Sequence, residues 1–229
     1  IGKVWQSLAK PDRLNSASPE RTIRIELDTH MMRLFVGVEI PHDIATDLYP
    51  LARGIKGLDA QTPENMHITL KFIGNVDPGL AGEIDQALSQ IAFEPFDLQV
   101  SGLDMFSSRR KVRIFWAGLK GQPVMNRLAN KVENALLALE ECPDMDMRKF
   151  TPHITLGRNR TAARASVEQA IADHADVTSR VFTVDRFCLY ESHSTTDGPE
   201  FRVIAAYDGS DEPRPQPDLA DEFATVDFP

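Results

Sequence analysis

Cysteine is scarce in this chain of 229 residues, which contains only Cys142 and Cys188. Two cysteines without metal-ligand spacing around them exclude a disulfide framework and a zinc motif. Cys188 lies in an apolar stretch, where we expect a reduced, buried thiol. Glycine-rich phosphate loops and the His-Glu-x-x-His pattern are missing too, so we expect neither a metal nor an organic cofactor.

A long apolar run is also missing. We therefore expect no membrane-spanning helix, no secretory signal and a cytoplasmic protein that does not act at membranes. Excess positive charge is lacking as well, since the net charge is −9. This charge argues against a protein that holds long nucleic acids by broad electrostatics. Local basic clusters, such as Arg109–Arg113, are better suited to a single nucleic-acid end.

Two terminal segments differ from the rest of the chain. Residues 1–31 lack a strong apolar period, and Met31-Met32 resembles a natural start of the chain. We therefore expect residues 1–31 to be an extension outside the fold. Residues 209–229 carry six acidic side chains against one arginine, with Pro213, Pro215 and Pro217 among them. Such a composition is typical of disorder. The folded domain is therefore predicted over residues 32–208.

The chain does contain a duplicated tetrapeptide. His-Ile-Thr-Leu occurs at His67–Leu70 and again at His153–Leu156. A single copy would mean little, because one histidine at a strand end is more often structural, but no packing rule requires the same four residues twice. Both copies lie in stretches that alternate apolar residues, Met66–Ile73 and Pro152–Gly157, and this alternation predicts strands.

Residues i and i+2 of a strand project from the same face. Two such strands side by side would therefore place His67, Thr69, His153 and Thr155 in one cleft. Imidazoles titrate near neutrality, so one can accept a proton while the other donates one, and threonine hydroxyls can bind an anion between them. Phosphodiester cleavage needs the proton acceptor and the proton donor on opposite sides of phosphorus. Two histidines in this arrangement can carry out the reaction without a metal.

The segments around the two motifs resemble the 2H phosphoesterases, and within them the bacterial RNA 2′,3′-cyclic phosphodiesterases once named 2′-5′ RNA ligases. Four segments agree with that family in order and spacing, and together they cover about residues 32–208. They are Met32–Pro41, Glu64–Gly74, Phe150–Arg158 and Leu189–Tyr207.

The resemblance implies hydrolysis of the terminal 2′,3′-cyclic phosphate of RNA to a 2′-phosphate. It makes His67 the proton donor to the leaving 3′ oxygen and His153 the proton acceptor that activates water, while Thr69 and Thr155 bind the phosphate. The expected substrates are RNA 3′ ends or small oligonucleotides, bound by a monomer without an obligatory protein partner. Two alternatives stay open: a nucleotide-binding or RNA-binding module without catalysis, and cleavage or joining of 2′-5′ linkages.

Three further residues are candidate substrate contacts. Lys71 has the same parity as His67 and Thr69, so it could face the cleft and neutralise phosphate. Arg158 has the opposite parity to its motif, and the resemblance favours a strand end or bulge that turns it inward. Phe35 could stack on a base, although packing in the core is equally compatible with its position.

The predicted fold is α+β, with two pseudo-symmetric lobes, each a mostly antiparallel sheet with helices outside, and a central cleft between them. Alternating strand and helix patterns along the chain support it. Pro50 is expected to kink or end the first helix, and Ser166–Gln169 to open a later one as a capping box. Val177–Tyr190 is expected to form one strand that pairs with Phe201–Tyr207.

Overall fold

The computed structural model describes residues 31–209, apart from residues 110, 142–144, 146–148 and 197. The predictions made for Cys142, for residues 1–30 and for the tail from residue 210 lie outside the described residues. The described chain forms β1 (Met32–Glu39), α1 (His42–Arg53), β2 (Leu58–Ala60), the short 3₁₀ helix η1 (Pro63–Asn65), β3 (His67–Val76), α2 (Pro78–Ser89), β4 (Phe96–Ser108), β5 (Lys111–Lys120), α3 (Gln122–Leu137), β6 (Ile154–Asn159), α4 (Arg164–Asp173), β7 (Thr178–Val184), β8 (Arg186–Thr195) and β9 (Gly198–Asp208).

These strands form one antiparallel sheet. Its order is β7-β4-β5-β6-β3-β1-β8-β9, and β2 pairs with β6 beside this path. The two central strands, β3 and β6, carry the two motifs and meet where Ile68 pairs with Ile154. The predicted α+β class with antiparallel strands is confirmed, and the two expected lobes are the two halves of a continuous sheet.

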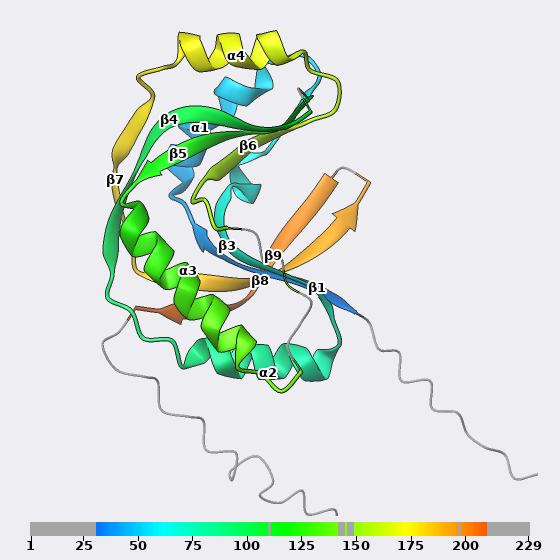
Figure 1. The fold of residues 1–229 in the computed structure, drawn as a ribbon, viewed down its shortest axis with the longest axis vertical. Coiled ribbons are helices and arrows are strands. Elements are labelled where there is room, and N and C mark those ends of the chain that lie inside the picture. The colour runs from blue at the N-terminus through cyan, green and yellow to red at the C-terminus, as the bar shows by residue number, and fades with distance from the viewer. Residues whose placement is uncertain (1–30, 110, 142–144, 146–148, 197, 210–229) are drawn as a thin grey trace, which may run out of the picture.

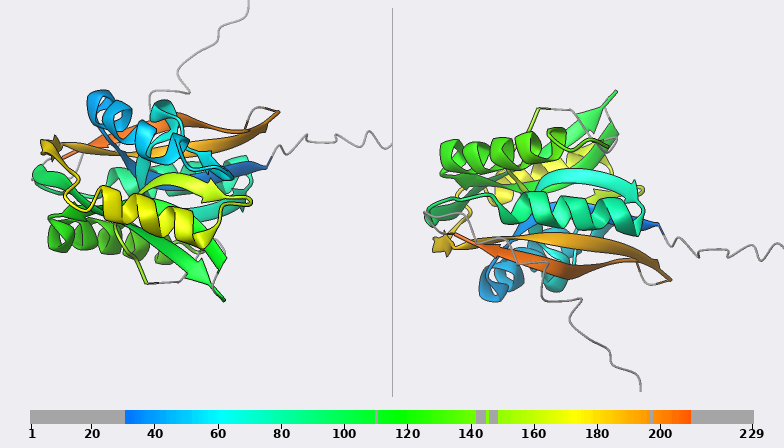
Figure 2. Two further views of the ribbon diagram at one scale, coloured as in Figure 1. Left: turned by 90° about the horizontal axis from the view of Figure 1, so that it is seen from above. Right: turned by 90° about the horizontal axis from the view of Figure 1, so that it is seen from below.

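The helices lie outside the sheet and are exchanged between its halves. Helix α1 follows β1 but contacts β2 and β6 of the other half, and α3 follows β5 but contacts β3 and α2. In Figure 1, α4 runs along the top of the molecule and α2 along the bottom, and Figure 2 shows the same helices from above and below. Each half of the sheet is therefore covered partly by a helix that the other half supplies in sequence.

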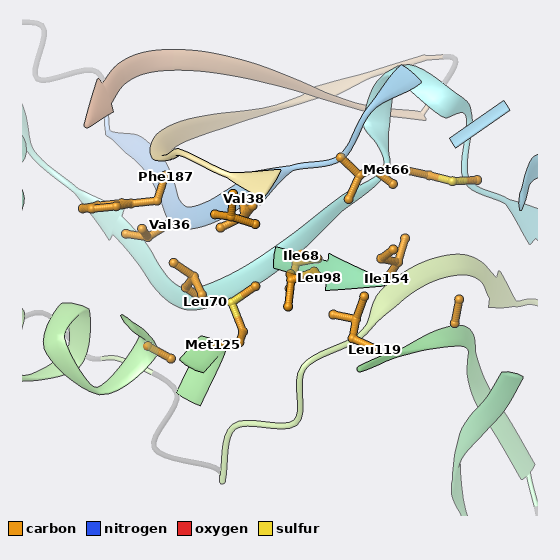
Figure 3. Close-up of a cluster of buried hydrophobic side chains, with 14 of the residues drawn as sticks. Val36, Val38, Met66, Ile68, Leu70, Leu98, Leu119, Met125, Ile154 and Phe187 are labelled. Atoms are coloured by element: carbon orange, nitrogen blue, oxygen red, sulfur yellow. The ribbon is translucent and has the colours of Figure 1, made fainter. Parts of the chain in front are cut away.

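The main hydrophobic core lies on the side of the motif strands from which isoleucine and leucine project. Ile68 and Ile154 are fully buried, and Leu70 and Leu156 are buried beside them. Figure 3 shows Ile68, Leu70 and Ile154 among side chains from β1, β4, β5 and α3. The two apolar residues of each motif thus anchor it in the core, as the alternation predicted, and leave its polar residues on the opposite face.

Two helix predictions are wrong in detail. Helix α1 continues through Pro50 to Arg53, so the expectation that this proline ends the helix is wrong, whereas the alternative of a kink stays a prediction. Helix α4 begins at Arg164, before Ser166, and its N-cap is Ala163, so Ser166 does not open a capping box. An ion pair in the first turn of α4, from Arg164 to Glu168 at 2.6 Å, lies where the box was expected. By contrast, Asp77 caps α2 as its position before a proline indicates, and accepts from two backbone N–H groups.

The predicted strand Val177–Tyr190 is also wrong, because it is two strands. Strand β7 pairs with β4, and β8 pairs with β1 and β9, so they lie at different ends of the strand order. Only Asp185 separates them, and aspartate is disfavoured in strand interiors. Because one residue spans so little distance, the sheet must curve until its two ends come close together. The expected pairing of the second piece with β9 is confirmed.

Close approach of β2 to β6 requires a glycine at position 157. A Cβ atom there would lie 2.8 Å from Leu58 Cδ2 and 3.1 Å from the Asp59 carbonyl oxygen. We expect Gly157→Ala to lower the free energy of unfolding by about 1–3 kcal/mol, since packed backbone must move. Gly82→Ala is the matched control: nothing lies within 4 Å of a Cβ at this helical position, and alanine should add about 0.5–1 kcal/mol. Urea unfolding measures both, and equal effects of the two changes would contradict the expectation.

Candidate active site

A β-bulge interrupts each motif strand at the leucine of its tetrapeptide. Along β3, Thr69 pairs with Gly37 and Lys71 with Val36, which leaves Leu70 as an extra residue. Along β6, Thr155 pairs with Trp116 and Gly157 with Phe115, which leaves Leu156 extra in the same way. An extra residue reverses the alternation of side chains beyond it. Consequently the fifth residue after each histidine, rather than the fourth, returns to the face of the motif.

The four motif side chains line one cavity of about 430 Å³. His67 and Thr69 enter it from β3, and His153, immediately before β6, enters it together with Thr155. The cavity is mixed in character, because basic residues and aromatic rings share its wall. The remaining lining residues are Gln61, Asn65, Leu70, Lys71, Phe72, Phe106, Ile114, Ala129, Glu133, Lys149, Phe150, Thr151, Arg158 and Phe201.

Both histidines are oriented by the same backbone contact. His67 Nδ1 lies 2.9 Å from the carbonyl oxygen of Asn65, and His153 Nδ1 lies 2.7 Å from that of Thr151. A carbonyl oxygen only accepts, so Nδ1 carries the proton in each ring. In the neutral rings, Nε2 is therefore the free base, and it is the atom available for proton transfer.

The hydroxyl of Thr69 interacts with His67 directly. Its Oγ1 lies 3.0 Å from Nε2, and with Nδ1 already protonated it donates to Nε2 of the neutral ring. If Nε2 takes up a proton, the direction of this bond must reverse or the bond must break. Protonation of His67 therefore releases the Thr69 hydroxyl to donate to another acceptor in the cavity.

Burial favours the neutral form of both imidazoles in the ligand-free protein. It lowers the pKa of His67 to about 4, and the positive charges of Arg158 and His153 act in the same direction, against the hydrogen bond to Asn65. Burial and Arg158 also lower the pKa of His153, while its bond to Thr151 opposes them. An anion bound between the rings would offset Arg158 and raise both values.

The predicted substrate contacts have different fates. Arg158 is exposed and lines the cavity, turned there by the bulge that precedes it. The shared face expected for Lys71 is wrong: the bulge at Leu70 turns this residue toward α3, where its ammonium group donates to Glu133 at 3.0 Å and only 7% of its side chain is exposed. It still borders the cavity on that side.

Phe35 is not available to a base. It is 2% exposed and forms a small second cluster with Cys188 and Tyr190, and its ring stacks on Tyr190 at 4.7 Å. The centroid of the Phe35 ring lies 4.8 Å from that of His67, so the phenyl ring packs against the imidazole. The stacking role predicted for Phe35 is therefore wrong, and the alternative of core packing holds. Cys188 is buried as expected, and burial raises the pKa of its thiol to about 12.

The sequence reasoning missed Phe72, an aromatic residue that does face the cavity. It is 44% exposed, and its ring lies 5.8 Å from Phe35. A signal was present, because Phe72 follows His67 by as many positions as Arg158 follows His153. The bulges make these two residues structural equivalents. Phe106, Ile114 and Phe201 also line the cavity, and no motif marked them.

Comparison with known proteins identifies the family. A family model described as LigT like Phosphoesterase matches residues 38–116 and 120–200. The chain belongs to the LigT-like phosphoesterase family. A curated relative from Archaeoglobus fulgidus, named RNA 2′,3′-cyclic phosphodiesterase, is 31% identical over 180 residues, which are 77% of this chain and 100% of the relative.

Two solved structures share the fold of this chain. The protein TT0787 of Thermus thermophilus superposes with a TM-score of 0.64 at 24% identity, and the match covers 77% of this chain and 97% of that protein. Escherichia coli LigT complexed with 3′-AMP gives 0.63 at 21% identity, covering 79% and 99%. Within the described part of this LigT-like chain, no helix is long and apolar enough to cross a membrane, and no three His, Cys, Asp or Glu side chains cluster as metal ligands would.

The depressed pKa of His67 predicts how stability depends on pH. In the unfolded chain His67 titrates near 6.5, and in the folded protein near 4, so between these values the unfolded state binds more protons. Stability should therefore fall as the pH drops from about 6.5 to about 4, by at most about 1.4 kcal/mol per pH unit from this group. The slope should flatten in His67→Asn, measured by urea unfolding across this range. An NMR titration that places His67 near 6.5 in the folded protein would contradict the expectation.

Proposed function

We propose that this LigT-like protein hydrolyses the terminal 2′,3′-cyclic phosphate of RNA to a 2′-phosphate in the cavity between β3 and β6. The observation that carries this proposal is the meeting of two imidazole Nε2 atoms and two threonine hydroxyls, from two copies of one tetrapeptide, in a single cavity. The name of the Archaeoglobus fulgidus relative supports the same substrate.

The phosphate seat consists of Thr69, Thr155 and Arg158. The two hydroxyls face the non-bridging oxygens from the two motif strands, and the guanidinium group supplies positive charge and a planar fork of donors. Of the two cations on the motif strands, Arg158 is better placed to move onto a ligand, since it is exposed, whereas Lys71 is bound to Glu133. A single phosphate diester with one negative charge suits this seat.

The two histidines divide the proton transfers. His67 donates to the leaving 3′ oxygen, and His153 accepts a proton from the attacking water, as in the family that the sequence resembles. Because His67 is neutral at pH 7 without ligand, it must take up a proton from solvent as the substrate binds, when the anionic phosphate raises the pKa of the ring. Protonation of Nε2 then frees the Thr69 hydroxyl to donate to the phosphate. Binding of the substrate and protonation of the general acid therefore occur together.

The exposed ring of Phe72 gives the base of the terminal nucleotide a surface for stacking. It lies on the β3 side of the cavity, opposite Arg158 in the pseudo-symmetric arrangement. Aromatic stacking tolerates any base, which suits a substrate defined by its phosphate rather than by its sequence.

Loss of either histidine should abolish turnover while the fold is retained. We expect His67→Ala and His153→Ala each to lower kcat by about 10²- to 10⁴-fold, because each removes one proton transfer. The assay follows a 2′,3′-cyclic nucleotide by phosphorus NMR, which also identifies the product as a 2′- or 3′-phosphate. Far-UV circular dichroism checks the fold of each variant.

His174→Ala is the matched control, since this histidine lies at the exposed C-terminal end of α4, outside the cavity. Near-normal hydrolysis by either of the two cavity variants would contradict the mechanism. A wild-type protein that bound the cyclic nucleotide without product would support the alternative of a binding module. Cleavage of a 2′-5′-linked dinucleotide in preference to the cyclic phosphate would support the other alternative.

Truncation of Phe72 should weaken binding of substrates that carry a base. Stacking contributes about 1–3 kcal/mol per base, so we expect kcat/KM for a 2′,3′-cyclic nucleotide to fall roughly 5- to 150-fold in Phe72→Ala, mainly through KM. Phe72→Trp should retain most of the activity. The 2′,3′-cyclic phosphate of methyl riboside, which has no base, should react equally well with wild type and Phe72→Ala. An equal loss on both substrates would show that Phe72 has no role in stacking.

A further inference from the structure

Asn65, two residues before His67, makes contacts on three sides. Its carbonyl oxygen accepts from His67 Nδ1 at 2.9 Å and from Gln61 Nε2 at 3.3 Å. Its side-chain Nδ2 donates to the carbonyl oxygen of Pro199 at 2.9 Å, on a residue far along the chain. One asparagine therefore joins the histidine, the segment before it and the start of β9.

The same network reaches the second motif strand. The backbone N–H of Gln61 donates to the carbonyl oxygen of Leu156 at 2.8 Å, which is the bulge residue of β6. A run of hydrogen bonds thus connects Leu156, Gln61, Asn65 and His67. It links the backbone beside Thr155 to the ring on the opposite strand of the cavity.

The contact with Pro199 fixes the part of β9 that covers His67. Strand β9 is an edge strand, paired with β8 alone in the sheet order, and the distal part of this hairpin stands out to the right in Figure 1. Phe201, two residues after Pro199, lines the cavity and meets His67 edge-on, with ring centroids 5.1 Å apart. It also packs edge-on against Phe35 at 5.2 Å.

We propose that the Asn65 side chain is a positioning group for the acid–base site: by binding Pro199 it holds the β8–β9 hairpin, and with it the Phe201 ring, closed against His67. The catalytic meaning of this clamp rests on the proposed function, whereas the clamp itself does not. Without the bond to Asn65, the start of β9 stays paired with the end of β8. This end of the hairpin then moves away from the His67 ring and takes Phe201 with it. Water then reaches His67, and the imidazole loses its packing contact with the Phe201 ring.

A clamp of this kind differs from a merely structural contact in its effect on His67. Among the residues that the structure describes, the titratable and charged groups that face this ring are Arg158 and His153 from the β6 side and the Tyr190 phenol from β8. Arg158 and His153 lie outside the hairpin, and Tyr190 is paired with Phe35 of β1, so none of them moves when the hairpin end opens at Pro199. Hydration is then the quantity that changes, and because burial lowers the pKa of His67, opening must raise it.

The test is an NMR titration of the His67 ring in ligand-free protein. In Asn65→Ala the midpoint should rise by on the order of one pH unit, because the ring gains water. Phe201→Ala should produce a similar rise, and the double variant should add nothing to the single ones, since both act through one contact. In the same variants KM for a 2′,3′-cyclic nucleotide should increase, and the acidic limb of the pH–rate profile should shift to higher pH. Asn126→Ala, an exposed asparagine on α3 outside the cavity, is the matched control.

Separate outcomes identify each failure. If Asn65→Ala lowers the melting temperature but leaves the His67 titration unchanged, Asn65 only supports the fold and the clamp is wrong. Should Asn65→Ala fail to fold, Asn65→Leu keeps the side-chain volume without the donor, and an unchanged titration in Phe201→Ala is by itself sufficient to overturn the clamp. If the variants show the expected shifts while the wild-type protein hydrolyses no cyclic phosphate, the clamp stands and the proposed function is contradicted.

Discussion

The one extra residue in each motif strand determines which side chains meet in this cavity. Leu70 and Leu156 are buried in the core, so the sheet accommodates each by a bulge and not by moving it outward. Beyond each bulge the faces are reversed, and the reversal brings Arg158 to the face of the motif residues, while Lys71 turns toward Glu133. Without the bulges, Lys71 instead of Phe72 and Gly157 instead of Arg158 would share the face of the motif residues.

The two halves of the site differ in the residue that lies across from the motif threonine. Gly37 lies across from Thr69, and Trp116 lies across from Thr155. With no side chain at Gly37, His67 settles onto β1, where a Cβ would lie 3.5 Å from its ring, and it reaches the cluster of Phe35 and Tyr190. His153 packs on the Trp116 indole instead. Two identical tetrapeptides thus receive different surroundings, which is the physical condition for an acid and a base of unequal character.

The sequence predicted what depends on local pattern and on repetition. The duplicated tetrapeptide was sufficient to bring His67 and His153 together, because strand alternation and burial of Ile68 and Ile154 leave little freedom. It could not predict the fate of Lys71 or Phe35, because a bulge depends on the partner strand and burial depends on Tyr190 and Cys188, which are distant in sequence. The split at Asp185 was missed for the same reason, since strand partners are tertiary information.

Proton uptake and closure of the hairpin act on the same ring and depend on each other. A dry His67 holds its proton weakly, so it remains a neutral acceptor of the Thr69 hydroxyl until an anion enters. The wall that keeps it dry includes Phe201, which Asn65 holds through Pro199. Loosening that wall would raise the pKa of His67 before any substrate binds, so in the proposed mechanism less of the shift that protonates the ring would come from the bound phosphate. In the proposed mechanism, where His67 becomes the acid only when the phosphate binds, the ring therefore needs rigid aromatic surroundings, and the hydrogen bonds of Asn65 supply that rigidity.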